Sequence, residues 1–110
     1  MKKSSIVFNV ELDQGNIPNR ITWDATDKPD EGTPETKSIS ISLWDHLQKN
    51  TMRIDLWTKD MPVDEMKRFY LDCLGGIAQS VLTSTGDETM STEINQLCER
   101  LATHIRKSGS

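Results

Sequence analysis

The sequence predicts an α+β protein: a four-stranded, mainly antiparallel sheet followed by two carboxy-terminal helices, a helical hairpin packed on one face of the sheet. In the first half of the chain, apolar residues recur at every second position, which is typical of half-buried strands. From residue 62 onward they recur every three or four positions, as on one face of a helix. A chain of 110 residues can bury one modest core, so we expect a single domain, residues 1–110.

Residues 5–12 and 19–24 are expected to form the first two strands. The intervening Asp-Gln-Gly-Asn sequence at residues 13–16 has the composition of a turn, so a hairpin is favoured. The apolar residues of the first strand that share one face are Ile6, Phe8, Val10 and Leu12.

Residues 25–37 are expected to be a solvated loop, because they contain two prolines, a glycine and almost nothing to bury. Acidic residues gather in and just before this stretch. Residues 13–35 carry six acidic and two basic side chains, a net charge of −4 that equals the net charge of the whole chain. Whether the acidic segment 24–35 has a role of its own stays open.

Residues 38–44 and 51–57 are expected to form the third and fourth strands, joined by a turn at residues 45–50. This register places Trp44 opposite Thr51, Ser42 opposite Arg53, Ser40 opposite Asp55, and Ser38 opposite Trp57. The residues expected on the apolar, inner face are Ile39, Ile41, Leu43, Met52, Ile54 and Leu56.

Two helices are expected at residues 62–84 and 87–106. Pro62 suits a helix start, and Thr85-Gly86-Asp87 reads as a helix stop followed by a new cap. The glycine pair Gly75-Gly76 inside the first helix indicates either close packing of this helix on the sheet or a kink. An antiparallel hairpin would align Met66 with Ile105, Tyr70 with Leu101, Cys73 with Cys98, Ile77 with Ile94, and Val81 with Met90.

The charge and hydropathy patterns exclude several classes of partner. The isoelectric point is near 5.1 and no basic stripe is present, so we expect neither nucleic acid nor an anionic membrane surface as a partner. No apolar run approaches the roughly 18 residues that span a membrane, so direct membrane insertion is not expected. Residues 4–11 reach a charge too early for a secretory signal, so we expect a cytoplasmic protein.

No motif for catalysis or metal binding is recognisable. His46 and His104 are far apart in the sequence and lack a metal-binding pattern. The spacing of Asp24, Asp27 and Asp30 differs from that of a calcium loop. No nucleophile elbow and no glycine-rich phosphate loop is present. We therefore expect no enzyme, no cofactor and no metal site.

The candidate site is a protein-binding surface formed by Trp44, Arg53, Asp55 and Trp57. These residues are expected on the outward face of the third and fourth strands, with a tryptophan near each end. Outward tryptophan and arginine are enriched in binding hot spots. The alternative is structural, because the tryptophans can also cover sheet edges or pack under loops.

Several segments of the chain resemble the gliding motility-associated GldC family of the Bacteroidetes. The segments that carry the resemblance are Trp23-Asp24-Ala25-Thr26-Asp27, Ser42-Leu43-Trp44-Asp45, Arg53 through Met61, Asp64-Glu65-Met66 and Thr85-Gly86-Asp87. The resemblance spans most of the chain and departs locally at Pro62, Gly75-Gly76 and residues 46–48. It implies a small cytoplasmic protein associated with gliding motility or the secretion machinery linked to it, and it brings no catalytic residues and no cofactor.

The leading functional hypothesis is a non-enzymatic accessory or adaptor protein that acts through protein–protein contacts. One alternative is a chaperone-like module that binds unfolded clients, since the order of strands and helices is similar to that of small export chaperones. The other is a small-ligand binder or an enzyme without a sequence signature. A homo-oligomer is also compatible with the sequence.

Overall fold

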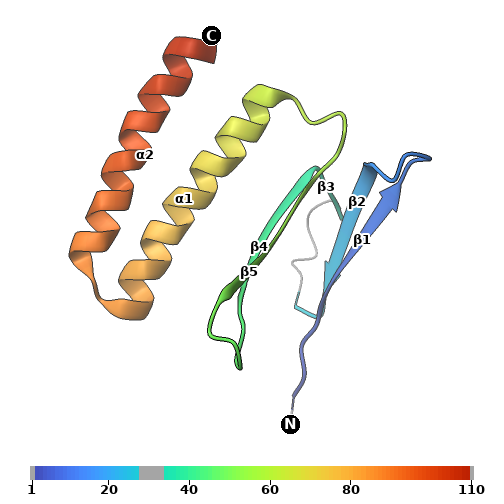
Figure 1. Cartoon of the computed structure of the whole chain (residues 1–110), viewed down its shortest axis with the longest axis horizontal. Helices are drawn as coiled ribbons and strands as arrows, with labels where there is room; N and C mark the ends of the chain where they lie inside the picture. The colour runs from blue at the N-terminus through green and yellow to red at the C-terminus, as the bar shows by residue number, and fades with distance from the viewer. Residues whose placement is uncertain (1, 28–33, 110) are drawn as a thin grey trace. The chain divides into compact units, whose positions relative to one another are not determined.

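The computed structural model describes residues 2–27 and 34–109. The chain divides into two compact units: Met1–Met61, which we call the strand unit, and Pro62–Ser110, which we call the helical unit. Each predicted strand and helix has a counterpart, which confirms the α+β class. The first unit contains β1 (Ile6–Leu12), β2 (Pro18–Ala25), β3 (Glu35–Thr36), β4 (Ser38–Trp44) and β5 (Thr51–Trp57), and the second contains α1 (Val63–Thr85) and α2 (Glu88–Gly109) (Figure 1).

The strands form two sheets, so the prediction of one four-stranded sheet is wrong. One sheet has the order β1-β2-β3 and the other contains β4 and β5, with antiparallel neighbours throughout. The difference arises at β3, which pairs with Ile21 and Thr22 of β2 and so occupies the edge that the next strand would need. A bend at Lys37 then separates β3 from β4. Packing of the helices on the sheet stays a prediction.

The predicted acidic loop is shorter than expected at both ends. β2 continues to Ala25, and the backbone N–H of Trp23 donates a hydrogen bond to the carbonyl of Pro34 (2.8 Å), just before β3 begins. Residues 28–33, the middle of the predicted loop, lie outside the described residues.

A side-chain hydrogen-bond pattern closes the turn between β1 and β2. The Asp13 carboxylate accepts hydrogen bonds from the backbone N–H groups of Gly15 (2.8 Å) and Ile17 (3.0 Å). Asn16 adopts a positive φ of 62°, a conformation that asparagine tolerates better than most residues. The predicted turn at residues 13–16 is therefore confirmed, and it sets the β1–β2 register.

The core of the strand unit is small and contains buried residues from both sheets. Ile21 of β2 is fully buried and Ile39 of β4 is nearly so. Thr58 is also buried, and its backbone N–H donates to the carbonyl of Lys37 (2.9 Å). The next residue, Lys59, donates its N–H to the carbonyl of Pro18 (3.0 Å). Backbone hydrogen bonds therefore join the segment after β5 to Lys37, just before β4, and to the start of β2.

The two helices form a hairpin whose turn follows the predicted stop and cap. Gly86 adopts the left-handed conformation (φ 74°), and its N–H donates to the carbonyl of Leu82 (3.0 Å). The Asp87 carboxylate accepts from the N–H of Met90 (2.9 Å), which caps α2. α1 begins one residue later than expected, with Pro62 at its N-cap, and α2 runs three residues further, to Gly109.

The helices touch through small residues. Ala78 and Ser91 are buried, and the Ser91 hydroxyl donates to the carbonyl of Ala78 (2.8 Å). Cys73 and Cys98 form no disulfide, and both are half-buried. At Gly75 and Gly76, an added Cβ atom would meet no atom within 4 Å. The contact between α1 and α2 therefore does not require either glycine.

Replacing Ile21 by alanine should lower the free energy of unfolding of the strand unit by about 2–5 kcal/mol, because the substitution leaves a cavity at a fully buried position. All three tryptophans lie in this unit, so their fluorescence during urea denaturation measures its unfolding. Leu47→Ala, at an exposed turn residue, is the control and should change the stability by less than about 0.5 kcal/mol. Equal effects of the two substitutions would contradict the assignment of Ile21 to the core.

Replacing Gly76 by alanine should stabilise α1 by about 1 kcal/mol, since glycine is a poor helix former and the added methyl group meets open space. The measurement is thermal unfolding followed by circular dichroism at a helical wavelength. A loss of stability would show instead that another surface approaches α1 closely at this position.

Candidate interaction face

The β4–β5 hairpin has the register that the sequence predicts. Ser42 lies opposite Arg53 and Ser40 opposite Asp55, and the tryptophans Trp44 and Trp57 lie at opposite ends of the pairing. Side chains alternate between the two faces of a strand. The hairpin therefore has one polar face, which we call the Arg53 face; its members are Ser38, Ser40, Ser42, Trp44, Thr51, Arg53, Asp55 and Trp57.

The turn at residues 45–50 is held by Asp45. Its carboxylate accepts hydrogen bonds from the N–H groups of Leu47 (3.0 Å) and Gln48 (2.6 Å). Its backbone N–H donates to the carbonyl of Asn50 (2.8 Å) and its carbonyl accepts from Lys49 (3.1 Å), which has a positive φ of 58°. This closed turn leaves the two strands a single register.

Arg53 is the centre of a hydrogen-bond network on the Arg53 face. Its Nη2 donates to the Oγ of Ser40 (2.7 Å) and to the Oδ1 of Asp55 (2.9 Å), and its Nη1 donates to the Oγ of Ser42 (2.6 Å). Its Nε donates to the Oδ2 of Asp55 (3.3 Å). The two-pronged contact with Asp55 fixes the plane of the guanidinium group.

The network also holds Asp55 in its charged form. The hydrogen bond from Arg53 is the main cause that lowers the pKa of the Asp55 carboxyl below its ordinary value, and the Ser40 hydroxyl (2.8 Å) adds to the effect. Four strand residues thus form a rigid array with a net charge of zero. Such an array can donate and accept hydrogen bonds at a surface, but it holds no unpaired charge.

The two tryptophans of the Arg53 face lie at its ends and are accessible. Trp44 is 66% exposed and Trp57 is 49% exposed. Trp57 also borders a shallow hollow, together with the aliphatic side chains of Ile17, Pro18 and Leu56 and the charged side chains of Asp55 and Lys59. The structure therefore brings the four predicted site residues onto one face. Binding through them stays a prediction.

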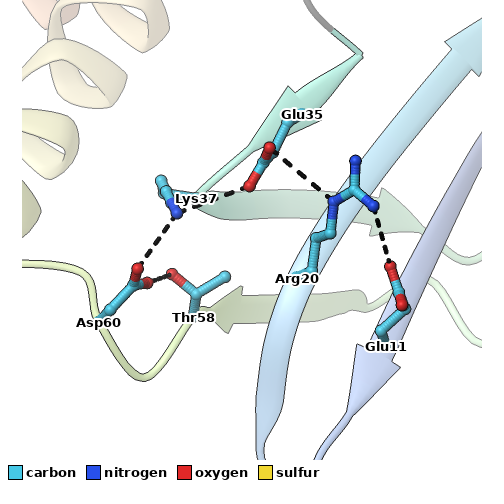
Figure 2. A network of polar contacts seen from close by, with 6 residues as sticks. All are labelled: Glu11, Arg20, Glu35, Lys37, Thr58 and Asp60. Carbon is cyan, nitrogen blue, oxygen red and sulfur yellow. Dashed lines mark hydrogen bonds and ion pairs between the residues drawn. The ribbon is translucent and has the colours of Figure 1, made fainter.

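A second polar network, which sequence reasoning missed, runs across the strand unit (Figure 2). Arg20 lies between Glu11 (3.6 Å) and Glu35 (3.8 Å), and Lys37 between Glu35 (3.6 Å) and Asp60 (3.2 Å). The only sequence signal for it is the pairing of Glu11 with Arg20, which appears once the β1–β2 register is known.

The second network shifts the pKa values of Lys37 and Asp60. The Thr58 hydroxyl donates to the Asp60 carboxylate (2.6 Å) and, with the Lys37 ammonium, lowers the pKa of Asp60. The hydrogen bond to Asp60 is the main cause that raises the pKa of Lys37. Close by, the N–H of Ile17 and the Lys59 ammonium (3.1 Å) lower the pKa of Asp13. These contacts join the β1–β2 hairpin to the segment after β5.

No metal or membrane-spanning element is found in the described part of the chain. Among residues 2–27 and 34–109, no three histidine, cysteine or acidic side chains lie close enough together to hold a metal ion. No helix in these residues is both long and apolar enough to cross a bilayer. Asp30, one of the three evenly spaced aspartates, lies outside the described residues.

Comparison with known proteins identifies one family. The model of the family described as gliding motility-associated protein GldC-like matches residues 18–107, which is most of the chain. No curated protein and no solved structure matches significantly.

Replacing Asp60 by asparagine should lower the free energy of unfolding of the strand unit at neutral pH. The difference in this free energy between the variant and the wild type should become smaller in acid. Because the folded-state pKa of Asp60 is lowered, its contribution is present above the unfolded pKa, about 4, and is lost as the pH falls through the folded value. Urea denaturation followed by tryptophan fluorescence at a series of pH values measures this difference.

The control for the Asp60 experiment is Asp72→Asn, which removes an exposed carboxylate from the helical unit. This substitution leaves the Lys37–Asp60 ion pair intact. The difference in free energy of unfolding between this variant and the wild type should therefore not follow the pattern expected for Asp60→Asn. If the difference for Asp60→Asn stays constant from neutral pH to about pH 3, the carboxylate does not stabilise the folded strands.

Proposed function

Because the chain belongs to the GldC-like family of gliding motility-associated proteins, we propose that it is a non-enzymatic accessory or adaptor protein that acts through contacts with another protein. The observation that carries this proposal is the Arg53 face, where two exposed tryptophans flank a polar array that is already hydrogen-bonded. The partner would belong to the gliding machinery or to the secretion machinery linked to it. The expected location of the protein stays the cytoplasm.

The tryptophans are the expected source of binding energy. Each has on the order of 100 Å² of apolar surface left to bury, which corresponds to about 2–3 kcal/mol of favourable transfer free energy. Thr51 and Trp57 are six residues apart on β5, so the face extends about 20 Å along the strands. This length suits the central patch of an ordinary protein–protein interface.

The polar array between the tryptophans favours specificity over charge attraction. The Arg53 guanidinium and the Asp55 carboxylate neutralise each other, so covering them does not bury an unpaired charge. The hydrogen bond that Ser40 donates to Asp55 and the one that Ser42 accepts from Arg53 also hold the array in place before a partner arrives. A preformed surface loses less conformational entropy on binding.

A chaperone-like activity is the second candidate, and one observation favours it. On the opposite, apolar face of the β4–β5 hairpin, Leu43, Met52 and Ile54 are each about half exposed, and accessible apolar surface can bind unfolded segments. Binding of many unrelated unfolded proteins by the purified protein would favour this candidate. One stoichiometric partner would favour the adaptor.

The double substitution Trp44→Ala/Trp57→Ala should reduce capture of the partner by about tenfold or more, because hot-spot tryptophans contribute most of the affinity at such interfaces. The experiment compares wild-type and variant tagged proteins in affinity capture from lysate of the native cell, with the captured partner quantified by mass spectrometry. Circular dichroism should show that the variant keeps its secondary structure.

Tyr70→Ala is the matched control, since it removes an exposed aromatic side chain from α1. It should leave capture unchanged. If the double variant captures the partner as well as the wild type does, the Arg53 face is not the interface. If only Tyr70→Ala loses the partner, the interface lies on the helices.

A further inference from the structure

The outer edge of β1 has no backbone partner in the described part of the chain. β1 is an edge strand, since the sheet has the order β1-β2-β3. The N–H of Thr26 donates to the carbonyl of Ser5 (3.0 Å), on the β1 side of β2. The N–H of Trp23 donates to the carbonyl of Pro34, on the β3 side of β2. Bonded and non-bonded pairs alternate in an antiparallel ladder. The residues that direct their N–H and C=O groups outward are therefore Ile6, Phe8 and Val10. Leu12 continues this alternation along β1, because the register shift between Glu11 and Leu12 places its extra residue, Asn19, on β2.

This edge has few of the features that usually prevent pairing with another strand. Natural edge strands are short, carry lysine, proline or an inward-pointing charge, or are twisted away by a β-bulge. The β1–β2 pairing has one irregularity, at the end of β1 between Glu11 and Leu12. β1 is seven residues long and contains neither lysine nor proline. Ile6 is 65% exposed and Leu12 is 53% exposed, and Val7, on the other face, is about half exposed. The strand thus presents open hydrogen-bonding groups beside one apolar face, Ile6 to Leu12, and one mixed face that carries Val7, Asn9 and Glu11.

We propose that β1 pairs antiparallel with β1 of a second copy of this chain, around a two-fold axis at Asn9. In this register Ile6 lies opposite Leu12, Phe8 opposite Val10, and Val7 opposite Glu11, each on the other copy. The two three-stranded sheets then become one continuous sheet with β1 and its counterpart at the centre. Since the same patch serves both copies, the interface closes on itself and forms a dimer.

The sequence of β1 favours a second copy as the occupant. All four residues of the apolar face meet apolar residues across the axis, and all seven residues of the strand find an opposite residue. The outward backbone groups of Ile6 and Phe8 meet the outward groups of Leu12 and Val10, so the open edge becomes a hydrogen-bonded ladder. A shift of the register by one residue would disrupt both the pairing of apolar side chains and the pairing of outward backbone groups, because it would place residues from opposite faces of the strand across from each other.

The charges of the strand agree with the same register. Glu11 is the only charged residue of β1. In the dimer it faces Val7 of the other copy, so the two Glu11 side chains are about 13 Å apart, four residues along the strand. Glu11 also keeps its contact with Arg20 of its own chain. Like charges therefore do not oppose each other across the axis.

The other edge of the same sheet is a weaker site for a second copy. β3 has only two residues, Glu35 and Thr36, and the Glu35 side chain is engaged by Arg20 and Lys37. A ladder there would be too short to hold two copies together. The inference does not depend on the proposed function, because the Arg53 face belongs to the β4–β5 sheet.

The first experiment measures the mass of the full chain by sedimentation over a range of concentrations. The wild type should be in reversible monomer–dimer equilibrium. Phe8→Pro removes an outward N–H, which an edge strand tolerates, whereas Phe8→Thr removes the same aromatic ring and keeps the N–H. Phe8→Pro should raise the dimer dissociation constant at least about tenfold above that of Phe8→Thr. A wild type that stays monomeric, or equal constants for the two variants, would overturn the proposal.

A second experiment tests the register and does not require a proline variant to fold. In a Cys73→Ala/Cys98→Ala background, Asn9→Cys would place two thiols at a non-hydrogen-bonded pair, where the Cα atoms are about 4.5 Å apart and a disulfide can form. Oxidised glutathione should therefore cross-link this variant into covalent dimers. Val7→Cys is the control, since its two copies would be about 13 Å apart. Equal cross-linking of both variants, or none with Asn9→Cys, would overturn the register.

Discussion

The register of the β4–β5 hairpin is the constraint on which the candidate site depends. The Asp45 carboxylate and backbone close the turn, and the turn decides which residues of the two strands lie opposite each other. Side chains alternate between faces, so a slip of one residue would move Arg53 and Asp55 to the apolar face. The hydrogen bonds from Arg53 to Ser40 and Ser42 cross between the strands and hold the same register.

Two ion pairs of the strand unit, Lys37–Asp60 and Lys59–Asp13, have a different role, because they connect segments that are distant in the sequence. Lys37 and Asp60, 23 residues apart, join the start of β4 to the segment after β5. Lys59 reaches Asp13 in the first turn, and its backbone bonds to Pro18. Each exposed pair adds little by itself. Together with the buried Thr58, they hold two short sheets in one unit that has few buried apolar side chains.

The two proposed interaction surfaces of the strand unit differ in kind. The Arg53 face offers side chains: two tryptophans and a neutral polar array. The β1 edge offers backbone groups in a row, which can be matched by an antiparallel strand. Because they lie on separate sheets, a dimer formed at β1 would leave both copies of the Arg53 face free. Such a dimer would present two binding faces to one assembly, which increases the effective affinity for repeated partners.

The amino-acid sequence by itself determined the α+β class, the two hairpin turns, the helix boundary at Gly86 and the joint placement of Trp44, Arg53, Asp55 and Trp57. These features follow from periodicity, turn composition and strand alternation, which act over a few residues. Only the tertiary structure decided that Glu35 and Thr36 form a strand and that the strands divide into two sheets. The Arg20–Glu35 and Lys37–Asp60 contacts depend on chain segments that meet only after folding, so no local sequence pattern predicts them.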